Sequence, residues 1–338
     1  MVAAVVESLP RLGLGCASLG NLYRAITRDQ ALAIVDAAWD AGWRYFDTAP
    51  YYGLGLSERR LGDALRERER ADYTISSKVG RLLDPDTATD IAAERHGFVT
   101  AMPFKVRYDY SYDGVMRSYE ASLQRLGLAR VDILLVHDIG IATHGSDNER
   151  HLADLWDGGY RALDELRGSG AISAIGLGVN EWQACADAME KGRWDCFLLA
   201  GRYTLLEQEP LHDFLPQCEA HGAKIILGGA YNSGILATGT RRGGELHYNY
   251  APAPQSVIDR VVRIEEICDA HGVTLAAAAL QFPLAHSVVQ SVIPGLGEAR
   301  RLRQTERLMS QAIPSAFWQQ LKREGLLDLE APVPVGRD

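Results

Sequence analysis

The sequence predicts an α/β fold, a (β/α)8 TIM barrel, on three observations. Strand-like runs and helical patterns alternate eight times along the 338 residues, and parallel strands joined by right-handed helical crossovers close most economically into a barrel. Single barrels of this class reach or exceed about 250 residues, so we expect one domain over residues 1–338. The first strand is followed by GCASLG, a poor match to the glycine fingerprint of an open doubly wound sheet, which disfavours that alternative.

Each expected strand is a short run of β-branched, aromatic or aliphatic residues, and each expected helix repeats apolar residues at helical spacing. In the first helix, Leu32, Val35 and Trp39 have this spacing and Gly42 ends it. The expected strands are residues 11–16, 43–46, 73–78, 131–136, 171–178, 195–199, 224–227 and 288–293. The expected helices are residues 28–41, 57–66, 112–126, 159–169, 181–191, 210–221, 257–271 with further helix over 275–284, and 298–308. Ser57 and Glu58 mark the capped start of the second helix.

Two connections are too long for simple loops, and one helix is left over. Residues 79–110 follow the third strand and are rich in Pro, Asp and Thr, and residues 228–254 follow the seventh strand. Insertions of this length are usually functional, so we expect both long loops to shape a site. Residues 316–324 form an extra C-terminal helix beyond the eight pairs.

The composition limits the possible partners. The hydrophobic fraction of 47% and the charged fraction of 23% are ordinary for a globular protein. The formal net charge of -9 argues against binding to nucleic acid or to an anionic membrane, because both attract basic surfaces. The first residues do not resemble a signal peptide, and the longest apolar run, near residues 273–280, is far shorter than the roughly 20 residues of a membrane span.

The cysteines favour a reducing compartment. No pair of them has CxxC spacing, which is typical of free thiols rather than of disulfides or a zinc site. We therefore expect a cytoplasmic protein with no metal. The five residues are Cys16, Cys185, Cys196, Cys218 and Cys268.

The most informative stretch is residues 43–58, WRYFDTAPYYGLGLSE. Asp47 falls where the second strand ends, and Pro50 and Gly53 exclude regular structure just beyond it. An acid at the carboxyl end of a strand, followed by two tyrosines in a loop, is an arrangement that a barrel enzyme uses for chemistry. The plainer alternative is a turn whose Asp caps its own backbone and whose tyrosines pack in the loop.

Four ionisable residues fall at the same end of three consecutive expected strands. Asp47 closes the second strand, Tyr52 lies just beyond it, Lys78 closes the third strand and His137 closes the fourth. Each alone has a structural explanation, such as a cap, a solvent-facing lysine or a buried histidine. The carboxyl ends of barrel strands gather on one face, so together these residues predict a catalytic site.

These residues lie in motifs that resemble the aldo-keto reductase superfamily. The matching text is RLGLGCASLG, FDTAPYYG followed by SERRLG, ISSKVG and LLVHD, and its order and spacing hold over almost the whole chain. The resemblance implies a (β/α)8 barrel that binds a nicotinamide cofactor, NAD or NADP, outside any Rossmann fold. It also implies an enzyme acting on a small molecule.

The chemistry of the four residues agrees with this resemblance. Tyr52 would transfer the proton, and because a free phenol titrates near about 10, a nearby Lys78 ammonium would lower its pKa. Asp47 would hold Lys78 charged and in place, and His137 would orient the substrate oxygen and help pass the proton. Tyr51 is the alternative acid, but Tyr52 directly precedes the glycine of the family pattern.

The resemblance also implies the cofactor contacts. Asn180, at the end of GLGVN, matches the residue that hydrogen-bonds the nicotinamide carboxamide. Val179, Ala200 and Gly228 depart from the Ser, Gln and Tyr that many members carry at or near these positions, which puts the ring packing in doubt. The expected cofactor residues are Cys16 and Ala17, mainly through backbone atoms, with Asp47, Asn180, Gly228, Gly295, Arg301 and Thr305.

The loop from Ile293, IPGLGEARRLRQTERL, corresponds to the clamp on the adenosine phosphate. NADP-specific members commonly place Lys and Ser where this chain has Gly295 and Leu296. Glu298 adds a negative charge at the start of the helix that would oppose a 2′-phosphate, whereas Arg301 remains as a good phosphate ligand. We therefore expect NAD, with NADP as the alternative.

Further motifs resemble the bacterial aldose 1-dehydrogenases of the L-fucose and D-threo-aldose type, and pyridoxal 4-dehydrogenases are similar too. These motifs are VGRLL, DYSYDGVMRSYEASLQRLG and HDIG with a following HG. The resemblance implies oxidation of the C1 hemiacetal of an aldose to a lactone, with pyridoxal oxidation or NADPH-dependent aldehyde reduction as alternatives. Channel β subunits also resemble the family, so a cofactor-binding regulatory subunit is the alternative of another class. Hydroxyl or phosphate recognition is expected from Arg81, Arg107, Tyr108, His144, Tyr231 and Asn232.

Overall fold

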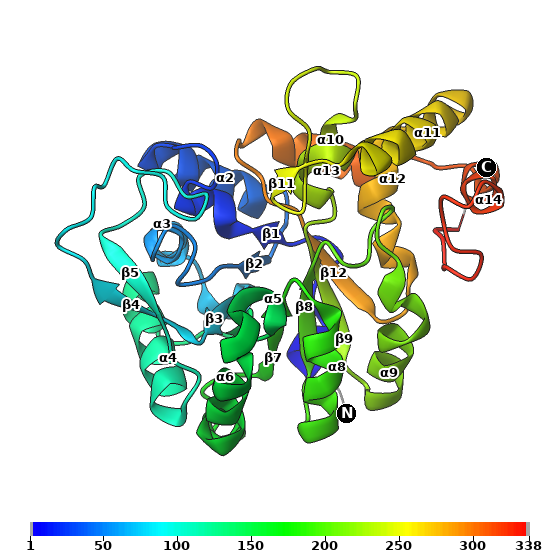
Figure 1. Ribbon diagram of the computed structural model, residues 1–338. Coiled ribbons are helices and arrows are strands. Elements are labelled where there is room, and N and C mark those ends of the chain that lie inside the picture. Colours follow the sequence, from blue (N-terminus) through cyan, green and yellow to red (C-terminus); the bar gives the residue numbers. More distant parts are fainter. Residues whose placement is uncertain (1–2, 336–338) are drawn as a thin grey trace.

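Eight parallel strands form the centre of the computed structural model, which describes residues 3–335 (Figure 1). Neighbouring strands pair in the order β1-β2-β3-β6-β7-β8-β9-β12. Backbone hydrogen bonds from Gly13 to Val292 and from Gly15 to Pro294 join the two outer strands, so the sheet closes into the expected (β/α)8 barrel. The strands are β1 Leu14–Gly15, β2 Tyr45–Asp47, β3 Thr74–Val79, β6 Ile133–His137, β7 Ala174–Val179, β8 Cys196–Ala200, β9 Lys224–Gly228 and β12 Val289–Ile293.

Helices surround the barrel, and most expected helices agree closely with the observed bounds. The helices that follow the eight strands are α2 Arg28–Asp40, α3 Leu56–Leu65, α4 Tyr112–Leu126, α7 Tyr160–Gly168, α8 Trp182–Lys191, α9 Phe214–His221, α12 Leu275–Gln281 and α13 Arg300–Ser310. The additional helices are α1 Ala4–Glu7, α5 Ile141–His144, α6 Asn148–Asp154, α10 Ile235–Thr238, α11 Gln255–His271 and α14 Ser315–Arg323. None of the helices within residues 3–335 combines the length and the apolar character needed to cross a membrane.

The two helices expected after the seventh strand, over residues 257–271 and 275–284, are both present, as α11 and α12. The residues of α12 from Leu275 to Leu280 are all buried, and the helix packs against α13 and α10. By contrast, α11 packs against the C-terminal α14 at the outside of the barrel (Figure 1).

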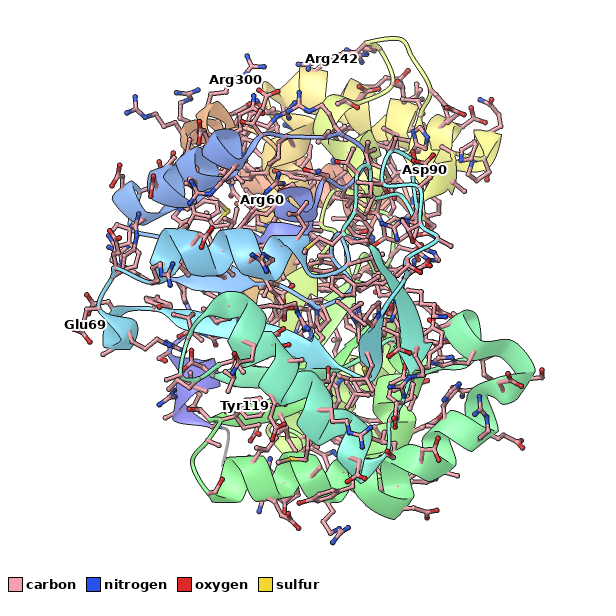
Figure 2. The ribbon with its side chains drawn as sticks, turned by 90° about the vertical axis from the view of Figure 1, so that its left-hand side faces the viewer. Arg60, Glu69, Asp90, Tyr119, Arg242 and Arg300 are labelled. Carbon is pink, nitrogen blue, oxygen red and sulfur yellow. The ribbon has the colours of Figure 1, made fainter. Side chains whose placement is uncertain are left out.

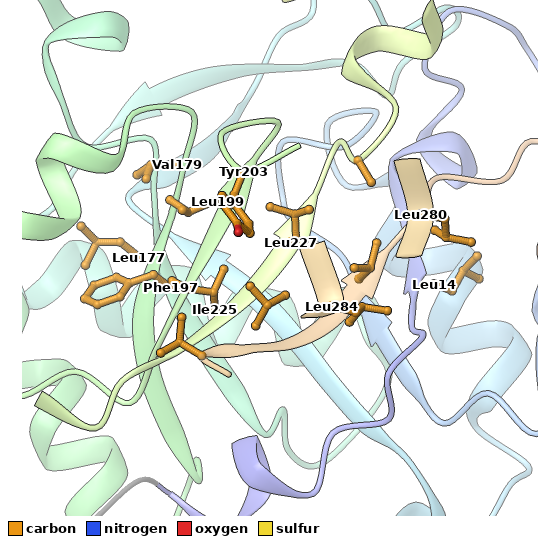
Figure 3. Close-up of a cluster of buried hydrophobic side chains, with 14 of the residues drawn as sticks. Leu14, Leu177, Val179, Phe197, Leu199, Tyr203, Ile225, Leu227, Leu280 and Leu284 are labelled. Atoms are coloured by element: carbon orange, nitrogen blue, oxygen red, sulfur yellow. The ribbon is translucent and has the colours of Figure 1, made fainter. Parts of the chain in front are cut away.

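Alternation along the strands divides the core into two parts. In β8, Phe197 and Leu199 point outward into the layer between strands and helices, which Figure 3 shows in close-up. Cys196 and Leu198, the alternate residues, pack inside the barrel with Tyr45 of β2. This two-residue period sets which side chains of every strand reach the barrel interior.

The first apolar run of the chain closes the amino-terminal end of the barrel. Val6 of α1 and Leu9 are buried among the inward-facing residues of β6, β7 and β8. Gln290 donates hydrogen bonds to the backbone oxygens of Glu7 and Leu9, both at 2.9 Å, which holds this segment against β12. The opposite, carboxyl end of the barrel is therefore the end at which a ligand can enter.

The two long connections contain structure that the sequence analysis did not predict. After β3, Arg81–Pro85 and Phe104–Tyr108 pair as the antiparallel strands β4 and β5, which form a sheet of their own. After β9, the connection contains α10 and the two-residue strands β10 His247–Tyr248 and β11 Ala251–Pro252. Residues 104–108, FKVRY, do alternate apolar and polar side chains, but the sequence analysis treated the whole connection as a loop.

Candidate active site

Strand geometry brings three of the predicted residues to one place. Asp47 is the last residue of β2, Lys78 lies near the end of β3 and His137 is the last residue of β6. Asp47 and Lys78 lie two residues after Tyr45 and Ser76, whose side chains hydrogen-bond each other inside the barrel at 2.9 Å. The two-residue period therefore turns both charged side chains inward at the carboxyl end.

Lys78 is the centre of the polar cluster. Its Nζ donates to both carboxylate oxygens of Asp47, each at 2.9 Å, to the Thr48 carbonyl at 2.9 Å and to the Tyr52 hydroxyl at 3.2 Å. The Lys78 and Asp47 side chains are each only 2% exposed. An ammonium group has three protons, so four acceptors leave it no freedom to turn away.

A hydrogen bond from Ser76 also orients the Asp47 carboxylate. Ser76 Oγ donates to Asp47 Oδ1 at 2.7 Å, and the Tyr45 hydroxyl lies 2.9 Å from the same Ser76 oxygen. Both supporting residues are fully buried. A buried carboxylate with this many donors has one orientation, so its negative charge stays beside Lys78.

Close backbone contact positions the loop that carries Tyr52. Gly53 has a φ of +66°, and a Cβ there would lie 2.4 Å from the carbonyl oxygen of Gly20. A Cβ on Gly20 would in turn lie 2.5 Å from the Tyr52 carbonyl carbon. Only glycine fits on both sides of this contact. The GCASLG segment and the YYG motif are therefore packed together by their glycines.

Ser57 does not cap the helix that follows, contrary to the expectation. The N-cap of α3 is Gly55, with φ +96° and no side-chain cap. Ser57 is the second residue of the helix and is buried, and its Oγ donates to the Cys16 carbonyl at 2.8 Å and lies 2.9 Å from Thr48 Oγ1. The hydroxyl therefore ties the loops after β1 and β2 together instead of starting a helix.

The pKa of Tyr52 shifts in the opposite direction to the expected one. Burial raises the pKa of the phenol well above its usual value, and the negative charges of Asp47 and Asp138 raise it further, against a smaller effect of Arg81. The Lys78 ammonium is paired with Asp47, and its charge is not among the main causes of this shift. The phenol is therefore protonated at neutral pH.

His137 is also neutral. Burial lowers the pKa of its imidazole well below the usual value, and the positive charges of Arg81 and Lys78 lower it further. Its Nε2 lies 3.6 Å from Asp138 Oδ2, which is not an ion pair because the ring carries no charge. A neutral ring can donate one hydrogen bond to a substrate oxygen, which fits the expected role of orienting that oxygen.

A buried ion pair beside these residues was only partly foreseen. Arg81, at the start of β4, donates to Asp138 Oδ2 at 2.5 Å, and its guanidinium lies 4.0 Å from the centre of the Tyr51 ring. Arg81 was expected among the loop residues, but Asp138 was not. The available signal was its position directly after His137 in the LLVHD motif.

A cavity of about 390 Å³ opens beside Tyr52 at the carboxyl end of the barrel. It is lined by all the expected cofactor residues except Asn180, namely Cys16, Ala17, Asp47, Gly228, Gly295, Arg301 and Thr305. Gly229 and Gly234 leave further backbone surface open to the cavity, and Tyr231 lies on its wall. A cavity that runs from a phenol to an arginine along glycine backbone fits an elongated cofactor with phosphates.

Two of the expected contacts have other partners. The Asn180 amide donates to Asp138 Oδ1 at 3.2 Å, and its oxygen accepts from the Tyr250 hydroxyl at 3.4 Å. Thr305 Oγ1 donates to the Arg301 carbonyl at 2.9 Å, within α13. Cys16 Sγ points to the Leu14 carbonyl at 3.5 Å, which leaves its backbone to face the cavity.

Arginines gather at the outer end of the cavity. Arg301 lines the cavity and also a second, adjoining hollow that Arg242, Arg300 and Arg307 share. Figure 2 shows Arg242 and Arg300 at the same end of the molecule. Glu298 sits within this positive region and lies 3.3 Å from Arg24. Its side chain hydrogen bond to Arg300 lowers the pKa of the carboxyl, so it is ionised at neutral pH.

Two other expected loop residues lie away from the site. Arg107 pairs with Asp84 at 2.8 Å on the exposed edge of the hairpin. Asn232 is buried and accepts a hydrogen bond from Thr204 at 2.6 Å, so it holds the loop after β9 rather than a ligand. His144 lies near the site with its Nε2 2.9 Å from the Tyr110 hydroxyl.

Comparison with known proteins agrees with this geometry. The family model described as Aldo/keto reductase family matches residues 11–324. The chain is 47% identical to a pyridoxal 4-dehydrogenase of Microbacterium luteolum, over 94% of each chain. It is 39% identical to a D-threo-aldose 1-dehydrogenase of a Pseudomonas species, over 96% of this chain and 97% of that protein.

Solved structures show the same fold at lower identity. An aldo-keto reductase from Bacillus halodurans in its holo form has a TM-score of 0.71 at 23% identity, over 94% of this chain and 92% of that one. The glycerol dehydrogenase of Gluconobacter oxydans has a TM-score of 0.72 at 20% identity, over 98% of this chain and 95% of that one. At these identities the likeness supports the barrel architecture alone.

Proposed function

This chain belongs to the aldo/keto reductase family, and from that premise we propose that it oxidises the C1 hemiacetal of an aldose to a lactone, using NAD. It is an oxidoreductase that works with a nicotinamide cofactor on a small molecule. The 39% identity to a D-threo-aldose 1-dehydrogenase over nearly the whole chain supports an aldose as substrate.

One observation carries the proposed chemistry. The Tyr52 hydroxyl accepts a hydrogen bond from Lys78 Nζ at 3.2 Å, and Tyr52 and Asp47 both line the cavity. In the proposed reaction the Tyr52 phenolate, formed when the phenol loses its proton to solvent, takes the proton of the C1 hydroxyl, while the neutral His137 ring donates a hydrogen bond to the same substrate oxygen. The nicotinamide cofactor, when bound, would accept the hydride of C1.

Pyridoxal is the second candidate substrate, because the chain is 47% identical to a pyridoxal 4-dehydrogenase. Pyridoxal carries an aldehyde next to a hydroxymethyl group and closes into a cyclic hemiacetal. Its oxidation would therefore need the same proton and hydride transfers as that of an aldose. Tyr23 and Tyr250, which line the cavity, offer aromatic surface for a pyridine ring.

The preference for NAD over NADP is argued from Glu298. Its carboxylate lies among the arginines where a 2′-phosphate would add a further negative charge. Gly295 has no side chain and Leu296 has no side-chain donor, so neither offers that phosphate a side-chain hydrogen bond. Dissociation constants measured by cofactor fluorescence should be lower for NADH than for NADPH. Tighter binding of NADPH would overturn this preference and assign the arginines to the phosphate.

The experiment that tests the function is an absorbance screen for NADH formation with aldoses and pyridoxal, using wild type, Tyr52→Phe and Tyr51→Phe. Tyr52→Phe should lose about two to four orders of magnitude in turnover, the usual share of general acid–base catalysis. Tyr51→Phe is the matched control, because it keeps the ring that stacks on Arg81 and removes a hydroxyl that is not a partner of Lys78. Near-normal turnover of Tyr52→Phe would remove Tyr52 from the mechanism.

The same screen decides between an enzyme and a cofactor-binding regulatory subunit. If tight NADH binding accompanies no turnover of any hemiacetal or aldehyde, the chain binds the cofactor without catalysis. We further propose a cytoplasmic location, supported by five cysteines that are all free and buried.

A further inference from the structure

Asp138 stands apart from the proposed proton-transfer residues but is close to them. It follows His137 directly, and its Oδ2 lies 3.6 Å from the Nε2 of that ring. Burial and Asp47 raise the pKa of Tyr52, and the charge of Asp138 raises it further, so the carboxylate is close enough to the phenol to interact with it electrostatically. Nothing in the proton and hydride transfer uses this carboxylate.

The structure holds the Asp138 carboxylate firmly and leaves part of it open. Arg81 donates to one oxygen at 2.5 Å and Asn180 to the other at 3.2 Å. Each carboxylate oxygen has two lone pairs, so each can accept one more hydrogen bond. The Asp138 side chain is 13% exposed, against 4% for Arg81, so the carboxylate is the member of the pair that a small molecule can reach.

The backbone at Asp138 is unusual and supports a functional role. Its φ is +46°, in the left-handed region that residues other than glycine rarely adopt, and its N–H donates to the Gly178 carbonyl at 2.9 Å. The strand thus ends in a bend that turns consecutive side chains, His137 and Asp138, toward one space. Strained residues of this kind cluster at ligand-binding sites.

We propose that Asp138, held by Arg81, accepts a hydrogen bond from the hydroxyl on the carbon next to the reaction centre and so determines which hydroxylated substrates are oxidised. The proposal rests on the proposed aldose dehydrogenase function. In an aldose, the C1 oxygen and the C2 hydroxyl lie within hydrogen-bond range of each other. His137 Nε2 and Asp138 Oδ2 lie 3.6 Å apart. The ring N–H can therefore donate to the C1 oxygen while the carboxylate accepts from the neighbouring C2 hydroxyl.

The test compares an aldose with its 2-deoxy analogue in wild type, Asp138→Asn and Asp138→Gly. Asn and Gly both tolerate a positive φ, so neither substitution adds backbone strain. The quantity measured is kcat/KM for the aldose divided by kcat/KM for its 2-deoxy analogue. A hydrogen bond to a charged group is stronger than one to a neutral group, so the ratio should fall about tenfold in Asp138→Asn and further in Asp138→Gly.

Asp84→Asn is the matched control. Asp84 forms the same kind of pair with Arg107 on the exposed edge of the hairpin, at 2.8 Å, and its ratio should equal that of wild type. Because either Asp138 variant leaves Arg81 unpaired, the double variant Arg81→Met with Asp138→Asn removes both charges. The double variant should also discriminate poorly if the carboxylate reads the hydroxyl.

The outcomes separate the inference from the function on which it rests. Turnover of both sugars with an unchanged ratio in the Asp138 variants would overturn the inference and leave the aldose dehydrogenase function standing. An unchanged ratio together with a higher dissociation constant for NADH would show that the carboxylate contributes to cofactor binding instead. If no aldose is oxidised by wild type, the proposed function fails, and the inference fails with it.

Discussion

At the scale of single residues, the Tyr52 phenol is not acidic because it is buried beside two carboxylates, while the Lys78 ammonium is immobilised by its hydrogen bonds. Its three protons are shared among four oxygens, and the two carboxylate contacts at 2.9 Å are shorter than the 3.2 Å contact to Tyr52. The positive charge of Lys78 is therefore largely neutralised by the Asp47 carboxylate, which reduces its effect on the phenol. Lys78 orients the hydroxyl through a hydrogen bond and acts less as a bare charge.

The raised pKa of Tyr52 predicts a pH dependence. Burial and the two carboxylates keep the phenol protonated, so its ionisation in the cofactor-free enzyme should lie above the usual value of about 10. Reduction of an aldehyde uses the protonated form and should be insensitive to pH near neutrality. Oxidation needs the phenolate, so its kcat/KM should keep rising with alkaline pH.

The measurement is a phenolate absorbance titration of wild type minus Tyr52→Phe, together with pH profiles in both directions. Because the pKa is raised, the folded protein should lose the Tyr52 proton only at a higher pH than a free phenol does. A difference titration that ends below the ordinary tyrosine range would contradict the structure.

At the scale of elements, a buried charge cluster fastens α3 and α4 to the barrel. Glu58 of α3 is fully buried and accepts hydrogen bonds from Ser77 of β3 at 2.8 Å and from Arg125 of α4 at 2.5 Å. Three elements thus meet on one carboxylate. The helix that begins just after the Tyr52 loop is therefore fixed from two sides.

This cluster predicts a large effect of one substitution. Arg125→Met leaves the Glu58 carboxylate buried without its cation, which should lower the free energy of unfolding by about 3–5 kcal/mol. Arg28→Met is the matched control, since its pair with Asp63 is exposed and should matter by about 1 kcal/mol or less. Urea denaturation measures both, and equal losses in the two variants would refute this account of the cluster.

Elements with a clear period could be predicted from sequence, and contacts between them could not. The strand ends at Asp47, Lys78 and His137 follow from the two-residue period, so the sequence was enough to bring these residues together. The pKa directions of Tyr52 and His137 were not available, because they depend on burial and on the charges of Arg81 and Asp138. The partners of Asn180 likewise depend on where the loop after β9 places Tyr250.

At the scale of the whole molecule, the closed barrel and its helices bury every cysteine. All five thiols are free and inaccessible, and burial raises the pKa of the Cys185 thiol well above its usual value. Buried thiols with raised pKa values are chemically inert. The native protein should therefore resist thiol reagents and oxidants.

A thiol count tests this packing. With an aromatic disulfide reagent, the native protein should release almost no chromophore, and the protein in denaturant should release that of five thiols. A mutant of the barrel closure, Gln290→Ala, removes the bonds to Glu7 and Leu9 and should expose thiols faster. Rapid labelling of the native wild type would show that the barrel opens more readily than its packing indicates.

The hairpin of β4 and β5 has a consequence for the origin of new specificities. It pairs only with itself, yet it contributes Arg81, which holds Asp138 beside His137. The proton-transfer residues are attached to barrel strands or to the loop packed on them. Exchange of this one ribbon between relatives would thus alter which molecules are accepted while the reaction itself is inherited unchanged.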